Sequence, residues 1–405
     1  MSKPVLTLSD GLPRVGVALP SISHDGQFIY VVFTDTNENI SQFFQNVNGK
    51  LFPGNALAKD NAFPDTQSGF ANNKFTRFSL LDADDPNGLG RIRIFDQSYN
   101  QIAQRTFNDV IGNAVFLGGK FSPDDRYVAL TYIYQNSPQR SILQVLDAQT
   151  LQTVASTTFD THTNGPEFLE YNCKLYVVVS SGGSVGPGFF GPPAQVTVYR
   201  LRHGTLTIVD SQSLPQFPRT TSVLNHSRCS NSDSCDPNIV VGTRAAFLQG
   251  EKGLAVDNST FPSFLPADGA EVRFYRFDGR RLKLVVKQNP NVSIYTTSFS
   301  AKHNWVVVSY VDEPVGSETG FLSVYENNKS LNILQSDIPV LPFAFVSQFS
   351  KSGKWFVIGG RNRPFADPVF NNVLLYRVHS ICNDKPHDKC HDRCRDDSCS
   401  CACDY

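Results

Sequence analysis

Cysteine and histidine side chains gather near the C-terminal end of this chain. Six of the nine cysteines and two histidines fall there: Cys382, His387, Cys390, His391, Cys394, Cys399, Cys401 and Cys403. Thiolates and imidazoles are the ligands that zinc and Cu(I) prefer. Six cysteines also suit three disulfides. The segment is too polar to build a core, so we expect it to be disulfide-linked, bound to zinc or copper, or reduced and free.

Two further cysteines, Cys229 and Cys235, lie close together in a Ser- and Asn-rich stretch. Their spacing suits a disulfide that closes a small loop. That pairing would leave Cys173 as a free thiol, which we expect to be buried beside a strand.

Asp82 and Asp84, followed by Gly88, hint at a calcium loop. The loop lacks the later oxygen ligands of an EF-hand, because Pro86 and Arg93 occupy those positions. The sequence therefore favours a solvated turn over a cation site.

Support for nucleophilic catalysis is weak. Most histidines before the tail fall in predicted turns, and no Gly-x-Ser-x-Gly motif stands at a strand–helix turn. We therefore assign no catalytic residue from the sequence.

The elements that must position these residues follow a regular spacing. Short apolar runs that end in an aromatic residue or leucine recur at Phe44, Phe95, Leu146, Tyr199, Tyr275, Tyr325 and Tyr376. We call these the seven spacing residues; the gaps between them are 51, 51, 53, 76, 50 and 51 residues. A constant period of this size is typical of repeat architectures. Seven units predict an all-β, seven-bladed β-propeller.

The clearest unit runs from about residue 113 to 159. Its strands are expected at 114–121, 126–132, 142–147 and 153–158, with turn residues at 122–125. Second strands of other blades are expected after residues 26, 74, 173, 303 and 353, and at 239–242 in the fifth blade.

Ring closure is predicted from the chain ends. The last unit lacks an outer strand, and residues 5–8 form a strand without a blade of its own. Pairing of the two would remove an exposed edge. We therefore expect a propeller over residues 1–380 and a Cys-rich tail over residues 381–405.

The motif Phe-Ser-Pro-Asp-Asp-Arg-Tyr-Val-Ala at 121–129, with strands like the one at 91–96, resembles the blades of WD-repeat and lactonase-like propellers. The resemblance covers most of residues 5–378. A WD-repeat-like propeller implies a protein-interaction scaffold. A lactonase-like propeller implies a hydrolase at the central channel mouth, for which Glu167, His162 and Arg219 are the candidate residues.

Loops between second and third strands are long, whereas turns between third and fourth strands are short. Long loops on a rigid scaffold commonly carry function. Aromatic and arginine side chains are common anchors of protein interfaces. We therefore predict a binding face with Phe189, Phe190, Arg361, Arg363 and Phe365.

Composition limits the remaining choices. The formal net charge is −1, so no basic excess favours nucleic-acid binding. No signal peptide and no apolar run long enough for a membrane span are evident. We therefore expect a cytoplasmic protein, or a component of a virion or other assembly. The predicted function is a non-enzymatic scaffold that binds a protein partner through its long loops; the alternative is the hydrolase.

Overall fold

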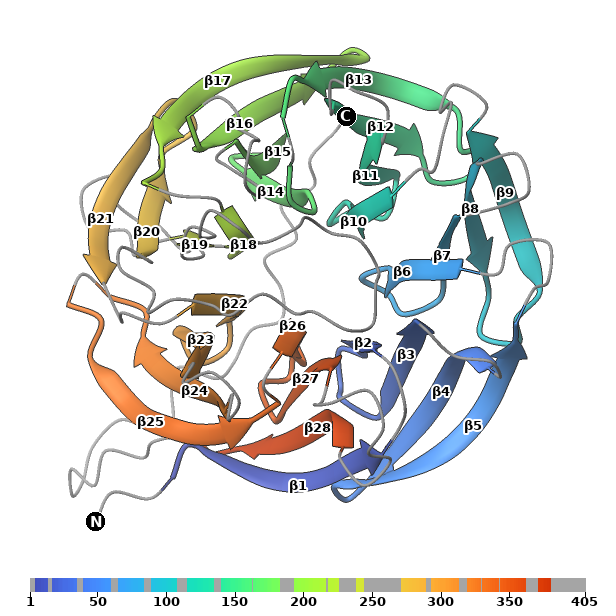
Figure 1. Ribbon diagram of the computed structural model, residues 1–405, viewed down its shortest axis with the longest axis vertical. Coiled ribbons are helices and arrows are strands. Elements are labelled where there is room, and N and C mark those ends of the chain that lie inside the picture. Colours follow the sequence, from blue (N-terminus) through green and yellow to red (C-terminus); the bar gives the residue numbers. More distant parts are fainter. Residues whose placement is uncertain are drawn as a thin grey trace, which may run out of the picture.

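The computed structural model describes most of the chain. It describes residues 4–13, 17–34, 39–59, 65–83, 89–107, 115–134, 140–161, 163–182, 193–215, 218–225, 238–243, 271–288, 293–312, 319–328, 330–341, 343–361 and 371–379. These residues form seven antiparallel four-stranded blades arranged as a ring, with no helix among them (Figure 1). The predicted seven-bladed β-propeller is therefore confirmed.

The four strands of each blade follow one another from the channel outward. Blade 1 contains β2 (Val17–Ile22), β3 (Phe28–Thr34), β4 (Asn39–Val47) and β5 (Lys50–Ala58). Blade 2 contains β6 (Asp65–Ala71), β7 (Phe78–Ala83), β8 (Gly90–Phe95) and β9 (Gln101–Phe107). Blade 3 contains β10 (Val115–Phe121), β11 (Tyr127–Tyr134), β12 (Arg140–Asp147) and β13 (Thr153–Phe159). Blade 4 contains β14 (Glu167–Tyr171), β15 (Lys174–Ser181), β16 (Gln195–Arg202) and β17 (Thr205–Ser213).

The other three blades complete the ring. Blade 5 contains β18 (Pro218–Val223), β19 (Ile239–Thr243), β20 (Val272–Phe277) and β21 (Leu282–Gln288). Blade 6 contains β22 (Ser293–Ser300), β23 (Trp305–Asp312), β24 (Thr319–Glu326) and β25 (Ile333–Val340). Blade 7 contains β26 (Phe343–Phe349), β27 (Trp355–Arg361), β28 (Asn371–Val378) and β1 (Leu6–Pro13).

The seven spacing residues all lie on the third strand of a blade and are all buried. Next to each of them, the register between the third and outer strands shifts by a β-bulge or similar irregularity. A bulge bends a strand and increases its twist. The outer strands can therefore wrap around the ring, and the period in the sequence marks this repeated bend.

The core is divided among the interfaces between blades. Seven large clusters of buried apolar side chains each span two neighbouring blades. Between blades 1 and 2, for example, Tyr30 and Phe43 meet Phe78 and Phe95. A blade therefore buries its two faces only when it has a neighbour on each side.

Closure is made by the N-terminal strand, as predicted. β1 pairs antiparallel with β28 and lies outside it in the ring (Figure 1). Gln335 on β25 holds the start of β1, because its Oε1 accepts hydrogen bonds from the backbone amides of Val5 and Leu6 at 2.8 and 2.9 Å. Leu6 and Val5 pack into the cluster between blades 6 and 7. A single register pair, Val17 with Arg361, further joins blade 7 to blade 1.

Removing residues 1–13 should lower the melting temperature sharply, because β28 would become an exposed edge and the apolar cluster between blades 6 and 7 would open.

Gln335→Ala should lower the free energy of unfolding by roughly 1–2 kcal/mol, because the backbone amides of Val5 and Leu6 would lose their hydrogen-bond acceptor. Thermal and denaturant unfolding measure both changes. Gln101→Ala, at an exposed position on β9, is the matched control. An unchanged melting curve for the truncated chain would contradict this account of closure.

Candidate functional site

A groove opens between blades 1 and 2, and a row of cross-strand neighbours forms one of its walls. Phe28 on β3 pairs with Gln45 on β4, and Gln45 pairs with Phe52 on β5. Directly paired residues project to the same face of a sheet. Phe28 is 40% exposed and Phe52 is 53% exposed, so two large aromatic side chains of one blade stand in solvent at this place.

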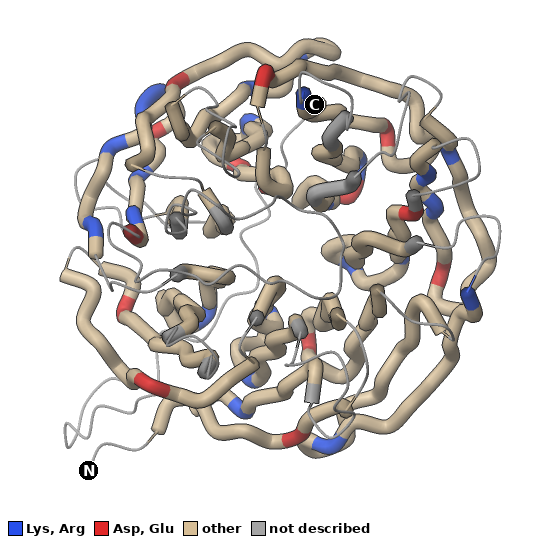
Figure 2. Tube along the Cα trace, in the orientation of Figure 1, with Lys and Arg blue, Asp and Glu red and all other residues tan. Residues whose placement is uncertain are grey.

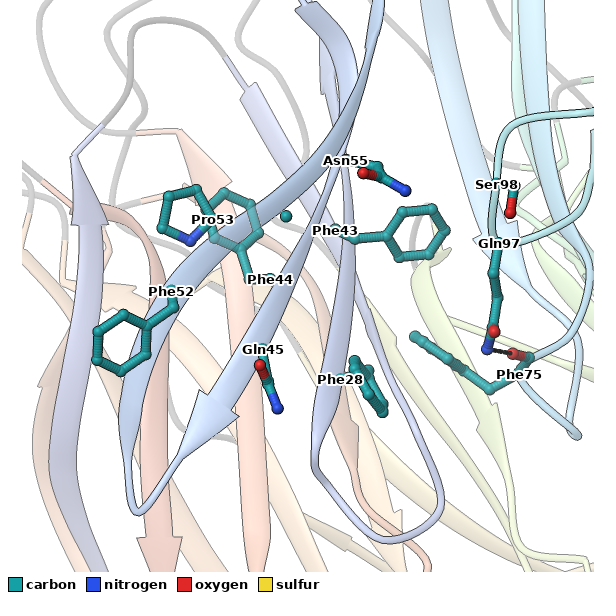
Figure 3. Close-up of a pocket in the computed structure, with 11 residues that line it drawn as sticks. Phe28, Phe43, Phe44, Gln45, Phe52, Pro53, Asn55, Phe75, Gln97 and Ser98 are labelled. Atoms are coloured by element: carbon teal, nitrogen blue, oxygen red, sulfur yellow. Dashed lines mark hydrogen bonds between the residues drawn. The ribbon is translucent and has the colours of Figure 1, made fainter.

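Blade 2 supplies the opposite wall through two turns. Phe75 lies in the turn between β6 and β7, and Gln97 and Ser98 lie in the turn between β8 and β9. Gln97 Nε2 donates a hydrogen bond to the Phe75 carbonyl at 2.9 Å, which ties the two turns together. In Figure 3, Phe43 points from β4 toward the turn that carries Gln97 and Ser98.

Phe75 adopts a backbone conformation that bulky residues avoid. Its φ is +56°, in the left-handed region that favours glycine. The same hydrogen-bonded turn position is held by Gly26 in blade 1 and Gly353 in blade 7. Asn72 stabilises the conformation, because its side-chain oxygen accepts the amides of Thr76 and Arg77. Asp125 holds the equivalent turn position of blade 3 with φ +62°, so this conformation recurs among the blades.

The ring of Phe75 is used for packing. It contacts Phe78 edge-on with centroids 5.0 Å apart, and Phe43 contacts the same ring edge-on at 4.6 Å. Edge-to-face aromatic pairs stabilise contacts beyond their buried area. The floor of the groove is therefore a fixed aromatic surface.

The groove has a volume of about 390 Å³, near the lower end of the sizes typical of ligand pockets. Its lining contains aromatic, amide, hydroxyl, proline and glycine residues and no charged side chain: Phe28, Phe43, Phe44, Gln45, Phe52, Pro53, Gly54, Asn55, Phe75, Gln97 and Ser98. Such a lining suits an uncharged apolar side chain, with amides available to bond its flanking backbone. The lining contains no acidic or basic side chain that could activate the Ser98 hydroxyl.

Blade 2 also contains a buried cluster of charged side chains around Asp82, which has a structural role. Asp82 on β7 is fully buried and bonds Arg91 Nη2 at 3.1 Å, Arg93 Nε at 2.8 Å and Thr66 Oγ1 at 3.0 Å. The prediction of a solvated turn at this residue is therefore wrong, because two arginines of the adjacent strand neutralise the carboxylate inside the blade. Asp84 and Gly88 lie outside the described residues.

Polar contacts connect the inner strands of neighbouring blades along the central channel. Lys120 on β10 bonds Glu167 on β14 at 3.2 Å, and Ser222 on β18 donates to the Thr297 carbonyl on β22 at 2.7 Å. Gln348 on β26 accepts the amide of Ile22 on β2 at 3.1 Å. These contacts join neighbouring blades, so the channel wall has a structural use.

Glu167 lies on an inner strand, as predicted. Burial raises the pKa of its carboxyl group, and the Lys120 ammonium opposes that rise. The two other candidates for a hydrolase, His162 and the side chain of Arg219, lie outside the described residues. Glu167 is thus engaged with Lys120 and is not joined by a described catalytic partner.

The predicted binding residues of the long-loop face are not among the described side chains. Phe189, Phe190, Arg363 and Phe365 lie outside the described residues, and Arg361 is described only as the last residue of β27. The predicted metal or disulfide residues of the tail also lie outside: Cys382, His387, Cys390, His391, Cys394, Cys399, Cys401 and Cys403. The same holds for Cys229 and Cys235.

Cys173 differs from its prediction. It is exposed in the turn between β14 and β15, with φ +54°, and it is disulfide-bonded. The prediction of a buried free thiol is therefore wrong. All other cysteines lie outside the described residues.

The sequence analysis missed the groove. Phe28 and Phe52 read as ordinary strand residues in sequence, and their shared exposure depends on how blade 1 packs on blade 2. Phe75 carried a weak signal, because blades 1 and 7 place glycine at this turn position, although blade 3 places Asp125 there. Among the described residues, no three His, Cys, Asp or Glu side chains gather as a metal site. No helix in the described part of the chain is long and apolar enough to cross a membrane.

Comparison with solved structures identifies the fold with that of WD40-repeat propellers. U3-55K aligns with a TM-score of 0.58 at 12% identity, covering 92% of this chain and 98% of its own. The WD40 repeats of RRP9 align with a TM-score of 0.58 at 11% identity, covering 93% and 98%. Sqt1 of Chaetomium thermophilum, bound to the N-terminus of the ribosomal protein L10, aligns with a TM-score of 0.53 at 10% identity, covering 90% and 97%. No protein-family model and no curated protein matches the sequence.

Asp82→Ala should destabilise the protein by about 3–5 kcal/mol, because Arg91 and Arg93 would lose the buried carboxylate that both of them contact. Denaturant unfolding gives the free energy directly. Asp96→Asn, in an exposed turn on the same blade, is the control and should change stability much less. Equal stability of the Asp82 variant and the native protein would contradict a structural role for this cluster.

Proposed function

We propose that this protein is a non-enzymatic scaffold that binds a protein partner. The observation that supports this most is the uncharged aromatic groove between blades 1 and 2, with Phe28 and Phe52 exposed at its edge. Exposed aromatic side chains on a fixed surface are the usual anchors of protein interfaces. Because the groove is built on strands and closed turns, little conformational entropy is lost when a partner binds.

The partner chemistry follows from the lining. A neutral aromatic or large aliphatic side chain gains from contact with Phe43 and Phe75, whereas a charged side chain would lose water without gaining a counter-ion. Gln45, Asn55 and Ser98 can bond the flanking peptide backbone. We infer that the groove receives one such apolar side chain from an uncharged segment of the partner.

The long-loop face is a second proposed surface, with Phe189, Phe190, Arg361, Arg363 and Phe365 as its anchors. The Cys-rich tail is proposed to cross-link the protein by disulfides or to bind zinc or copper, within a larger assembly such as a virion. The disulfide at Cys173 supports an oxidising setting for such an assembly.

One comparison supports a binding role in general terms. Sqt1 shares the propeller architecture, and its structure contains the bound N-terminus of the ribosomal protein L10. The same fold therefore presents surfaces to peptide segments elsewhere. The hydrolase alternative gains no support from the described channel wall, where Glu167 pairs with Lys120.

The groove can be tested with a random peptide display library selected on the intact protein. Enriched peptides should carry a neutral aromatic or large aliphatic residue. Phe52→Ser and Phe75→Gly should each weaken binding of an enriched peptide by about tenfold or more, measured by isothermal titration calorimetry. Glycine tolerates the positive φ at this turn, but Phe75→Gly also removes the ring contact with Phe78, so thermal unfolding of this variant is measured alongside binding.

Ile208→Ser, at an exposed apolar position on the outer strand of blade 4, is the matched control and should bind like the native protein. Absence of enrichment, or equal losses in the control, would count against the groove as the binding site.

Thiol mapping tests the covalent part of the proposal. Alkylation without reductant followed by peptide mass analysis should leave Cys173 unmodified, because it is disulfide-bonded. Reduction should then raise the intact mass by about 2 Da per bridge. If Cys173 is alkylated before reduction, the bridge is absent in the purified protein.

Native mass spectrometry tests the metal alternative for the tail. Added mass that corresponds to zinc or copper ions and that a chelator removes would assign the tail to metal binding.

A further inference from the structure

One apolar side chain recurs at the start of every outer strand. In each blade, one residue of the outer strand pairs with the spacing residue, and the residue two places before it is leucine in six blades and tyrosine in one. These seven interface residues are Leu6, Leu51, Tyr99, Leu151, Leu206, Leu282 and Leu331. Each packs in the apolar cluster between its own blade and the preceding blade.

Three of the interface leucines are also held through their backbone amides by a side chain of the preceding blade. Each acceptor lies two places after the residue that pairs with the spacing residue of its own blade, which we call the acceptor position. The pairs are Asp10 with Leu51 at 2.8 Å, Asp210 with Leu282 at 2.6 Å and Gln335 with Leu6 at 2.9 Å. This arrangement therefore takes a leucine amide and a leucine side chain together, at three places in the ring.

The acceptor position is apolar in three other blades, which carry Ala103, Ala155 and Val286 there. Two of the leucines that follow them, Leu151 and Leu331, donate their amides to carbonyls of their own turns. An alanine or valine side chain has no atom that could accept an amide. In these blades the acceptor position therefore makes no demand for a donor.

Blade 1 is the exception among the seven. Its acceptor position is Asn55, two places after Pro53, which pairs with Phe44. The interface residue of the next blade is Tyr99, and its amide donates to the Asp96 carbonyl within its own turn at 3.1 Å. The Asn55 side chain forms no hydrogen bond within the described part of the chain. Asn55 thus has the place of the three acceptors without receiving an amide from the protein itself.

Asn55 is exposed and lines the groove between blades 1 and 2. In Figure 3, its side chain extends from β5 toward Ser98 on the opposite wall. Charged residues are spread around the ring, but β4 has none and β5 has only Lys50 at its start (Figure 2). Asp10, by contrast, lies 3.7 Å from the Lys50 ammonium. A neutral acceptor suits a groove whose lining supplies no counter-ion.

We propose that Asn55 Oδ1 accepts the backbone amide of the apolar residue that the groove receives from a protein partner. One partner residue then makes both contacts, with its amide on Asn55 and its side chain against Phe43 and Phe75. Leucine in an extended segment is the expected residue, because leucines at the start of outer strands make both contacts at the three occupied acceptor positions. The role of Asn55 depends on the proposed function of the groove, to which it adds the contact that fixes the partner backbone.

The test uses the full-length protein and a peptide selected from the display library whose affinity falls with Phe52→Ser. Methylation of the backbone nitrogen of its apolar anchor residue should weaken binding by about three- to tenfold, the range of one net hydrogen bond. Asn55→Ala should weaken binding of the unmethylated peptide by a similar factor. The methylated peptide should bind the Asn55→Ala variant almost as well as the unmethylated one does, because both changes remove the same bond. Isothermal titration calorimetry measures all four affinities.

Three controls accompany this cycle. Asn55→Asp should retain binding, because Asp10 and Asp210 serve as acceptors at the same position. Thr207→Ala, at an exposed position on the outer strand of blade 4, should bind both peptides like the native protein. The melting temperature of the Asn55→Ala variant should match that of the native protein, because the side chain is exposed and forms no internal bond.

The outcomes separate this contact from the groove itself. If methylation weakens binding to the native protein and to the Asn55→Ala variant equally, the amide is bound elsewhere; the role of Asn55 is then overturned while the groove stands. Unchanged affinity of the unmethylated peptide for the Asn55→Ala variant has the same meaning. If no selected peptide depends on Phe52, the groove fails as the binding site, and the role of Asn55 fails with it.

Discussion

The packing of one blade face against the next is the interaction on which this structure depends. Each of the seven apolar clusters lies between two blades, so no blade completes its core alone. The ring must therefore close, and the first strand of the chain closes it by pairing with the last. Gln335 fixes the start of that strand from the neighbouring blade, which links closure to the packing of blades 6 and 7.

The same packing explains why the groove exists and why it is rigid. Blades 1 and 2 meet through aromatic rings, with Phe43 and Phe75 both edge-on to Phe78. At the edge of this interface, Phe28 on β3 and Phe52 on β5 remain exposed to solvent. The backbone strain at Phe75 is offset by its ring contacts and by the Asn72 cap. The groove is thus an extension of a core interface.

Near the axis the blades are tied by polar contacts instead of apolar ones. The Lys120–Glu167 pair, the Ser222–Thr297 bond and the Gln348–Ile22 bond each cross from one inner strand to the next. Hydrogen bonds between turns extend this series to the channel mouth. The result is a stiff ring on which surface side chains keep their relative positions, as a binding scaffold requires.

The sequence by itself determined the architecture, because the seven spacing residues recur at a nearly constant interval and each marks a buried third strand with its adjacent bend. It also determined closure, because an unpaired strand at one end matched a missing strand at the other. The sequence could not determine the environment of Asp82, because its burial depends on Arg91 and Arg93, which face it from the adjacent strand. Only the tertiary structure decided the groove. It joins side chains from two different blades, and the distance between blades is not encoded in any local pattern of residues.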